Sequence, residues 1–149
     1  MSCDAAASVA FFWLAATGPM APGPGPAMSP PPSVASEPLF VDIVARAKTL
    51  KAQVDAFRGT DKPITPAFHA AVSALSDLDM KGHLLLAQRG TDGDLKCILR
   101  GISQDLPLKL AAVDAAAADR KARDTALRDM SYLLNDNVEV ITAPPAPPA

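Results

Sequence analysis

The sequence has few aromatic residues and few cysteines, and both shortages limit its fold class. Its 149 residues include one tryptophan, one tyrosine and five phenylalanines, whereas strands are enriched in aromatic and β-branched side chains. Alanine, which has the highest helix propensity, is the commonest residue. The two cysteines, Cys3 and Cys97, are too few for the disulfide framework of a small secreted domain and fit a reducing compartment. These features favour an all-α protein of the cytoplasm.

The chain also lacks an excess of charge of one sign. Lys and Arg number 14 against 16 Asp and Glu, and between Leu39 and Thr142 each sign occurs 14 times. A surface that binds nucleic acid needs a concentration of basic side chains to neutralise phosphates. We therefore expect no nucleic acid among the partners of this protein.

The longest apolar run covers residues 5–16 and reads AAASVAFFWLAA. A membrane-spanning helix needs about 20 residues, so we expect no membrane span. The run has the length of a signal-peptide core, but the charge before it is Asp4, where a signal peptide carries basic residues. Three interpretations stay open. The run is part of a disordered tail, or lies before a true translation start at Met20 or Met28. Alternatively, it belongs to a signal peptide over residues 1–18 of a periplasmic or secreted protein, or it is a membrane-surface anchor.

Proline, which is excluded from the interiors of helices and strands, is concentrated at the two ends of the chain. Of the 15 prolines, eight lie in residues 19–38 and four in residues 144–148. Such segments bury little apolar surface and are expected to stay disordered. The sequence thus predicts a disordered tail over residues 1–35, one folded domain over residues 36–142, and a disordered Pro/Ala tail over residues 143–149.

The start of this domain has a clear helical pattern. Apolar residues from Phe40 to Phe57 follow steps of three and four, which place them on one face of a helix. Ser36 is expected to cap this helix, Pro38 to lie in its first turn, and Gly59 to end it in the left-handed conformation. The pattern lasts under three heptads, which is short for a coiled-coil dimer. It therefore predicts one helix of an antiparallel bundle of three to four helices.

A second helix is expected from Thr65-Pro66 to the residue before Gly90. Threonine is a good helix cap, and proline is tolerated at the first helical position. Gly82 lies inside this helix, where glycine costs about 1 kcal/mol relative to alanine. We expect either a bend at Gly82 or the close approach of a neighbouring helix.

Pro107 is expected to divide the remaining sequence, because proline disrupts the helical turn that precedes it. A short third helix would cover Leu95–Ile102, and a last helix would cover Leu106–Leu134. The last helix would be about 43 Å long and the first about 30 Å, so the last should overhang the bundle. Residues 138–141 alternate in polarity and are expected to form an extended segment.

The overhanging helix carries the predicted interaction surface, because its alanine ridge allows close helix packing and its apolar side needs a cover. A mixed-charge run over residues 119–129 is expected to form a solvated face beside it, with pairs such as Arg120 and Asp124. The expected partner is another protein or a second copy of this chain. The predicted contact residues are Ala118, Ala122, Ala126, Met130, Leu133 and Leu134.

Few side chains suited to catalysis or metal binding occur in a recognisable pattern. His69, His83 and Cys97 are each 14 residues apart, whereas metal-binding pairs usually lie closer in a helix. Asp77 and Asp79 lie on different helix faces, which is unsuitable for an acid and base pair. Cys97 is expected to pack as a small apolar side chain. We expect no enzyme activity and no catalytic, metal or cofactor site.

Three functional classes stay open on this evidence. The first is a non-enzymatic helical protein–protein interaction module, such as an adaptor, a regulator or a chaperone. The second is a histidine phosphotransfer or sensory component, which would need His69 or His83 exposed on the bundle. The third is a periplasmic helical bundle, which would need a genuine signal peptide at the N-terminus.

Overall fold

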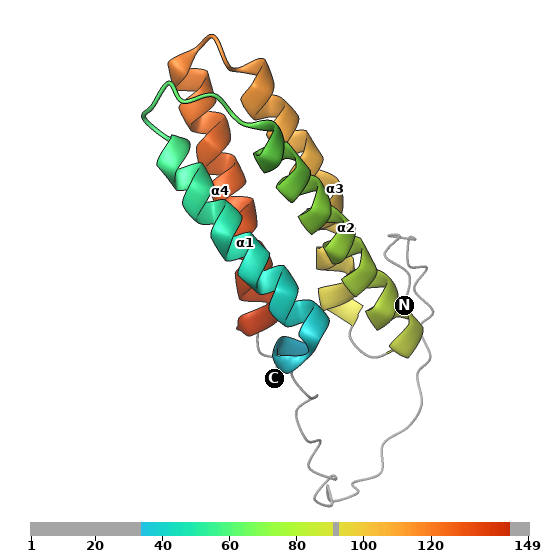
Figure 1. Cartoon of the computed structure of the whole chain (residues 1–149). Coiled ribbons are helices and arrows are strands. Elements are labelled where there is room, and N and C mark those ends of the chain that lie inside the picture. Colours follow the sequence, from blue (N-terminus) through green and yellow to red (C-terminus); the bar gives the residue numbers. More distant parts are fainter. Residues whose placement is uncertain (1–33, 91–92, 144–149) are drawn as a thin grey trace, which may run out of the picture. The chain divides into compact units, whose positions relative to one another are not determined.

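The computed structural model of this chain describes residues 34–90 and 93–143. Within these residues the secondary structure is helical, with four α-helices and a short 3-10 helix and no strand, which confirms the predicted all-α bundle (Figure 1). The tails and the candidate signal segment lie outside the described residues, apart from residues 34, 35 and 143. The elements are η1 (Val34–Ser36), α1 (Pro38–Phe57), α2 (Pro66–Arg89), α3 (Gly93–Ala115) and α4 (Arg120–Thr142).

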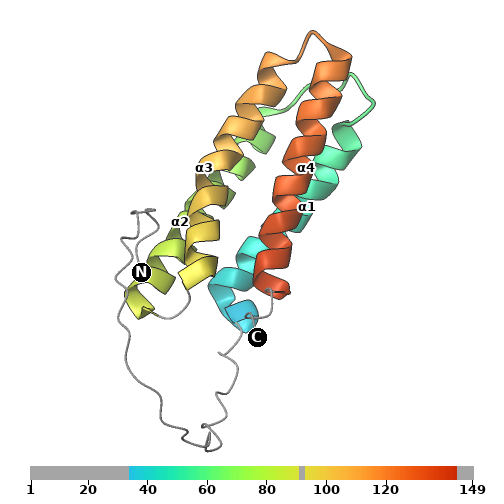
Figure 2. The ribbon, with the colours of Figure 1, turned by 180° about the vertical axis from the view of Figure 1, so that it is seen from behind.

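The four helices run alternately up and down, and each packs against two neighbours. Helix α1 lies beside α2 and α4, and α3 lies beside the same two helices (Figures 1 and 2). The pairs α1 with α3 and α2 with α4 therefore lie on the two diagonals of the bundle. Residues 58–65 and 116–119 connect helices at one end, which is uppermost in Figure 1 and is called the upper end below.

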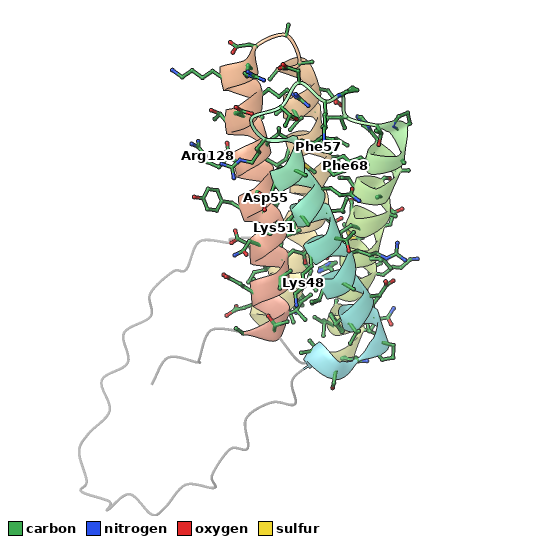
Figure 3. The ribbon with its side chains drawn as sticks, turned by 60° about the vertical axis from the view of Figure 1, so that its left-hand side comes forward. Lys48, Lys51, Asp55, Phe57, Phe68 and Arg128 are labelled. Atoms are coloured by element: carbon green, nitrogen blue, oxygen red, sulfur yellow. The ribbon has the colours of Figure 1, made fainter. Side chains whose placement is uncertain are left out.

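The core lies between all four helices. At the upper end, the rings of Phe57 and Phe68 meet edge to face with their centroids 5.4 Å apart (Figure 3). Burial of a side chain the size of leucine stabilises a fold by about 1.5 to 3 kcal/mol, so the fully buried apolar side chains provide most of the driving force for folding. The large apolar side chains that are fully buried are Phe40, Ile43, Val54, Val72, Leu75, Leu86, Leu99, Leu106, Leu127, Met130, Leu134 and Ile141.

The predicted boundaries of α2 are confirmed. The Thr65 side chain accepts a hydrogen bond of 3.2 Å from the backbone N–H of Phe68, and Pro66 is the first helical residue. Gly90 follows the helix in the left-handed conformation with φ of 63°. Local signals in the sequence therefore determine both ends of this helix.

The start of α1 differs from the prediction. Pro38 is its first residue as expected, but the cap position belongs to Glu37 and Ser36 lies in η1. The N–H of Glu37 bonds to the carbonyl of Val34, so the preceding turn fixes Glu37 at the cap. Its carboxylate accepts two hydrogen bonds of 2.8 Å from Arg89 of α2, which lower the pKa of Glu37. After the helix, Gly59 is left-handed with φ of 69°, as predicted.

Helix α2 continues through Gly82, where side chains of the neighbouring helices approach its backbone closely. A Cβ atom placed on Gly82 would lie 3.1 Å from Cδ1 of Leu99, 3.4 Å from Cε1 of Phe40 and 3.5 Å from Cδ1 of Ile43. Side chains of α1 and α3 thus occupy the space that any larger residue would need. Of the two explanations left open for Gly82, close approach is the correct one.

The predicted restart at Pro107 is wrong, because α3 runs through this proline without a break. Proline has no N–H, so the carbonyl four residues earlier loses its helical partner. That carbonyl belongs to Ser103, and it accepts a hydrogen bond of 2.7 Å from the hydroxyl of Ser76 on α2. A neighbouring helix therefore provides the bond that the proline removes.

The predicted long last helix is also wrong. Helix α3 ends at Ala115, and α4 starts at Arg120 after Asp119 caps it by accepting a 3.1 Å hydrogen bond from the N–H of Ala122. The four α-helices of the described residues contain 20 to 24 residues each, so no overhang exists. The extended segment predicted over residues 138–141 is wrong as well, because these residues belong to α4 and Ile141 packs in the core.

Candidate functional site

The six predicted contact residues do not form one surface. Met130 and Leu134 are fully buried in the core, and Leu133 packs partly against it. Ala118 is exposed in the connection between α3 and α4, whereas Ala122 is exposed and Ala126 half-buried in the first half of α4. The alanines are therefore the part of the predicted set that a partner can reach.

A shallow groove runs between the end of α3 and the first half of α4, which lie side by side in Figure 2. We call it the α3–α4 groove, and its volume is about 490 Å³. Four of its lining residues are alanines, so another helix can come close to it. The lining consists of Lys109, Ala112, Ala116, Asp119, Lys121, Ala122, Thr125, Ala126 and Asp129.

A second groove lies on the other side of α4, next to the end of α1. This α1–α4 groove has a volume of about 440 Å³ and shares Lys121 and Thr125 with the first. Its side chains are mostly basic, and Arg128 points away from the bundle in Figure 3. The lining consists of Arg58, Arg120, Lys121, Asp124, Thr125 and Arg128.

The charges along the two grooves are unevenly paired. Asp119 caps α4, and Asp129 lies 3.6 Å from Arg128. Lys109 and Lys121 form no ion pair with any residue in 34–90 or 93–143. The positive charge of the α3–α4 groove is therefore open to a partner, whereas its negative charge is already engaged.

Arg123 of the mixed-charge run lies in the interior, with 7% of its surface exposed. Its guanidinium donates a hydrogen bond of 2.7 Å to the carbonyl of Thr60 and another to the carbonyl of Lys62. These two carbonyls belong to the connection between α1 and α2. The prediction that the whole run is a solvated face is wrong, because Arg123 holds this connection to α4.

The predicted pair between Arg120 and Asp124 is also replaced by contacts with the same connection. Arg120 donates to a carboxylate oxygen of Asp61 at 3.0 Å, and Asp124 accepts from the N–H of Gly59 at 2.9 Å. Gly59 can offer its N–H in this direction because it adopts the left-handed conformation. Polar contacts of Arg120, Arg123 and Asp124 thus hold the start of α4 to the upper end of the bundle.

The two histidines have separate partners. His69 lies 2.9 Å from the carbonyl of Thr65 through Nδ1 and 2.9 Å from a carboxylate oxygen of Asp114 through Nε2. The Thr65 carbonyl and then the Asp114 carboxylate raise the pKa of His69, because only the cationic ring donates from both nitrogens. His83 is half-buried, and its Nδ1 lies 2.7 Å from the carbonyl of Lys96.

The contacts of His69 limit the phosphotransfer function that the sequence leaves open. A phosphotransfer histidine needs an open ring nitrogen, which His69 does not offer while it is paired with Asp114. Among the described residues, no three His, Cys, Asp or Glu side chains lie close enough together to hold a metal ion. Cys97 is disulfide-bonded, which corrects the expectation of a packed thiol. Cys3 lies outside the described residues.

A buried polar pair in the core was not predicted. Asp79 of α2 and Asn137 of α4 are both fully buried, and the amide nitrogen of Asn137 donates a 2.8 Å hydrogen bond to Oδ2 of Asp79. Burial raises the pKa of Asp79 to about 8, although the bond from Asn137 acts in the opposite direction. The signal was present in the sequence, because steps of three and four put Asp79 in the apolar stripe of α2 between Leu75 and Gly82.

Comparison of the chain with protein-family models, with curated proteins and with solved structures finds no match in any of the three. Along residues 34–90 and 93–143, no helix has the length and apolar character needed to cross a bilayer.

Proposed function

We propose that this protein is a non-enzymatic interaction module that holds an acidic helical segment of another protein in the α3–α4 groove. The observation that carries the proposal is the combination of four alanines with two unpaired lysines, Lys109 and Lys121, around one groove. Helical segments are commonly recognised by laying an apolar face into a groove between helices. Short alanine side chains suit a partner helix that approaches closely.

The charges around the α3–α4 groove determine which kind of partner helix it favours. The carboxylates of the groove are engaged within the protein, so the lysines are the groups that need a partner of opposite sign. In the adjoining α1–α4 groove, Arg58, Arg120 and Arg128 each lie 3.0 to 3.6 Å from a carboxylate oxygen of this protein, so they add less to the attraction than the two lysines do. Complementary charge sets specificity and increases the association rate more than it increases affinity. An acidic helix therefore fits this surface better than a basic one.

The proposal is tested with two synthetic helical peptides that share an alanine and leucine stripe and differ in their flanking residues, which are glutamate in one and lysine in the other. NMR titration should show that the glutamate peptide shifts the amide signals of groove residues, whereas the lysine peptide does not. The variant Ala122→Glu should abolish the shifts by filling the groove and adding repulsion, and Lys109→Glu with Lys121→Glu should weaken binding at least tenfold. Lys48→Glu, on α1 outside both grooves, is the matched control and should bind normally.

Equal binding of the two peptides, or shifts that map outside the groove, would contradict the proposal. Sedimentation velocity supplies the other outcome of interest. If the free protein is a dimer that Ala122→Glu converts to a monomer of unchanged helicity, the occupant of the groove is a second copy of this chain.

A further inference from the structure

Asp79 and Asn137 join two helices that lie on a diagonal of the bundle. Their hydrogen bond connects α2 to α4 across the core, although these helices are not direct neighbours. Both side chains are fully buried. Nearby side chains at this level of the core, around Gly82, are the apolar groups of Phe40, Ile43 and Leu99.

The hydrogen bond leaves one oxygen on each side chain unsatisfied. Asp79 uses Oδ2 and Asn137 uses its amide nitrogen, whereas Oδ1 of each residue is buried without a partner. If Asp79 were ionised, both of these oxygens would be acceptors with no donor to bond. Buried polar atoms without partners are rare in native proteins, and each calls for a physical explanation.

We propose that Asp79 carries a proton on Oδ1 in the folded protein and donates it to Oδ1 of Asn137, which closes a cyclic pair of two hydrogen bonds. The amide of Asn137 donates to the acid in one direction, and the acid donates to the amide in the other. A single proton thereby satisfies both unpaired oxygens. The pair is a buried proton-binding site that links the stability of the bundle to pH.

No cation is placed to hold Asp79 in its ionised form. Among the described residues, the pKa of Asp79 depends on burial and on Asn137 alone, and charged groups contribute nothing to it. Two basic side chains that could have stabilised an ionised Asp79 have other partners. Arg46 pairs with Asp42 on α1, and His83 bonds to the carbonyl of Lys96. The remaining ionisable groups on adjacent turns are Asp77 and Lys81 of α2, Lys96 and Arg100 of α3, and Asp136 and Glu139 of α4.

The direction of the pH effect follows from linkage. The pKa of Asp79 is about 8 in the folded protein and 3.8 as its ordinary value, so between these limits the folded state holds one proton that the unfolded state has released. The stabilisation is complete below about pH 4 and is lost as pH rises through about 8. Within that range the unfolding equilibrium constant should rise about tenfold per pH unit.

The test compares the wild type with Asp79→Asn. The substituted amide donates to Oδ1 of Asn137 as the acid does, but it cannot titrate. Urea unfolding should show that the ratio of the two unfolding constants, wild type over variant, rises about 100-fold from pH 5 to pH 7. Asp77→Asn removes an exposed carboxylate two residues away and should keep the wild-type slope. A constant ratio for Asp79→Asn would overturn the proposal.

A direct measurement on the wild type covers the case in which Asp79→Asn fails to fold. With 13C-labelled aspartate, the Asp79 carboxyl carbon should have the chemical shift of a protonated acid at pH 6 and should titrate near pH 8. The carboxyl signal of Asp79 is assigned as the one that is missing from the spectrum of a variant that lacks this aspartate. A titration of this carbon near pH 4 in the folded protein would show an ionised Asp79 and would refute the cyclic pair.

Discussion

The hydroxyl of Ser76 on α2 donates a 2.7 Å hydrogen bond to the backbone carbonyl of Ser103 on α3. This carbonyl lies four residues before Pro107 and is the one whose helical partner the proline removes. The contact therefore replaces a bond within α3 by a bond between two helices. A proline that would ordinarily end a helix instead fastens α3 to its neighbour.

Replacing Ser76 by alanine should destabilise the bundle by about 1 to 3 kcal/mol, because it leaves a buried carbonyl without a donor. In the background Pro107→Ala, which restores the N–H of residue 107, the same change should cost much less. Urea unfolding of the wild type, both single variants and the double variant measures this coupling. Additive effects of the two substitutions would contradict the assigned role of Ser76.

Glycine has opposite roles at two helical positions. Gly82→Ala should destabilise the protein, because its new Cβ would press on Leu99 and overpacking costs about 1 to 3 kcal/mol. Gly101→Ala should stabilise it by up to about 1 kcal/mol, because the Cβ would meet no atom within 4 Å. Thermal unfolding of both variants compares the same chemical change in two settings. A stabilised Gly82→Ala protein would show that Leu99 can move aside.

Arg123 should resist conservative replacement. Lysine cannot span the carbonyls of Thr60 and Lys62 as a planar guanidinium does, so Arg123→Lys should lower the free energy of unfolding by about 1 to 3 kcal/mol. Limited proteolysis should then cut the connection between α1 and α2 faster. Arg128→Lys, at a half-exposed site, is the control and should behave as the wild type. Equal cleavage rates in the two variants would remove the assigned role of Arg123.

His69 should titrate above its ordinary pKa of 6.5. Because the folded-state pKa is raised, the stabilisation from its cationic form is complete below pH 6.5 and is lost as pH rises through the folded value. Asp114→Asn should lower the pKa of His69 but keep part of the rise, since the Thr65 carbonyl is the larger cause. NMR titration of the imidazole signals measures both values. An unchanged pKa in Asp114→Asn would show that the two side chains do not interact in solution.

The parts of the fold that the sequence predicts correctly are those determined by neighbouring residues. Thr65 caps α2, and Gly59 and Gly90 follow helix ends in the left-handed conformation. The apolar steps in α1 identify its buried face for the same reason. Each of these signals acts within one or two helical turns.

The parts that the sequence does not predict depend on contacts between distant residues. Pro107 looks like a break until Ser76, in another helix, is known to satisfy the carbonyl of Ser103. Asp79 and Asn137 are 58 positions apart, so neither identifies the other. The regular spacing of the alanine stripe predicts one long helix, whereas α3 ends at Ala115 and Asp119 caps a separate helix α4, which Arg123 holds to the connection between α1 and α2.

The Asp79 and Asn137 pair also restricts how the helices can be aligned along their length. Sliding α4 by one turn would displace Asn137 by about 5.4 Å, which would break its bond of 2.8 Å to Asp79. Both side chains would then be buried against apolar neighbours, at a cost of about 1 to 3 kcal/mol for each unsatisfied group. Leucine and valine stripes tolerate such slippage, but a single polar contact across the diagonal does not. One alignment of the four helices is thereby favoured over its shifted alternatives.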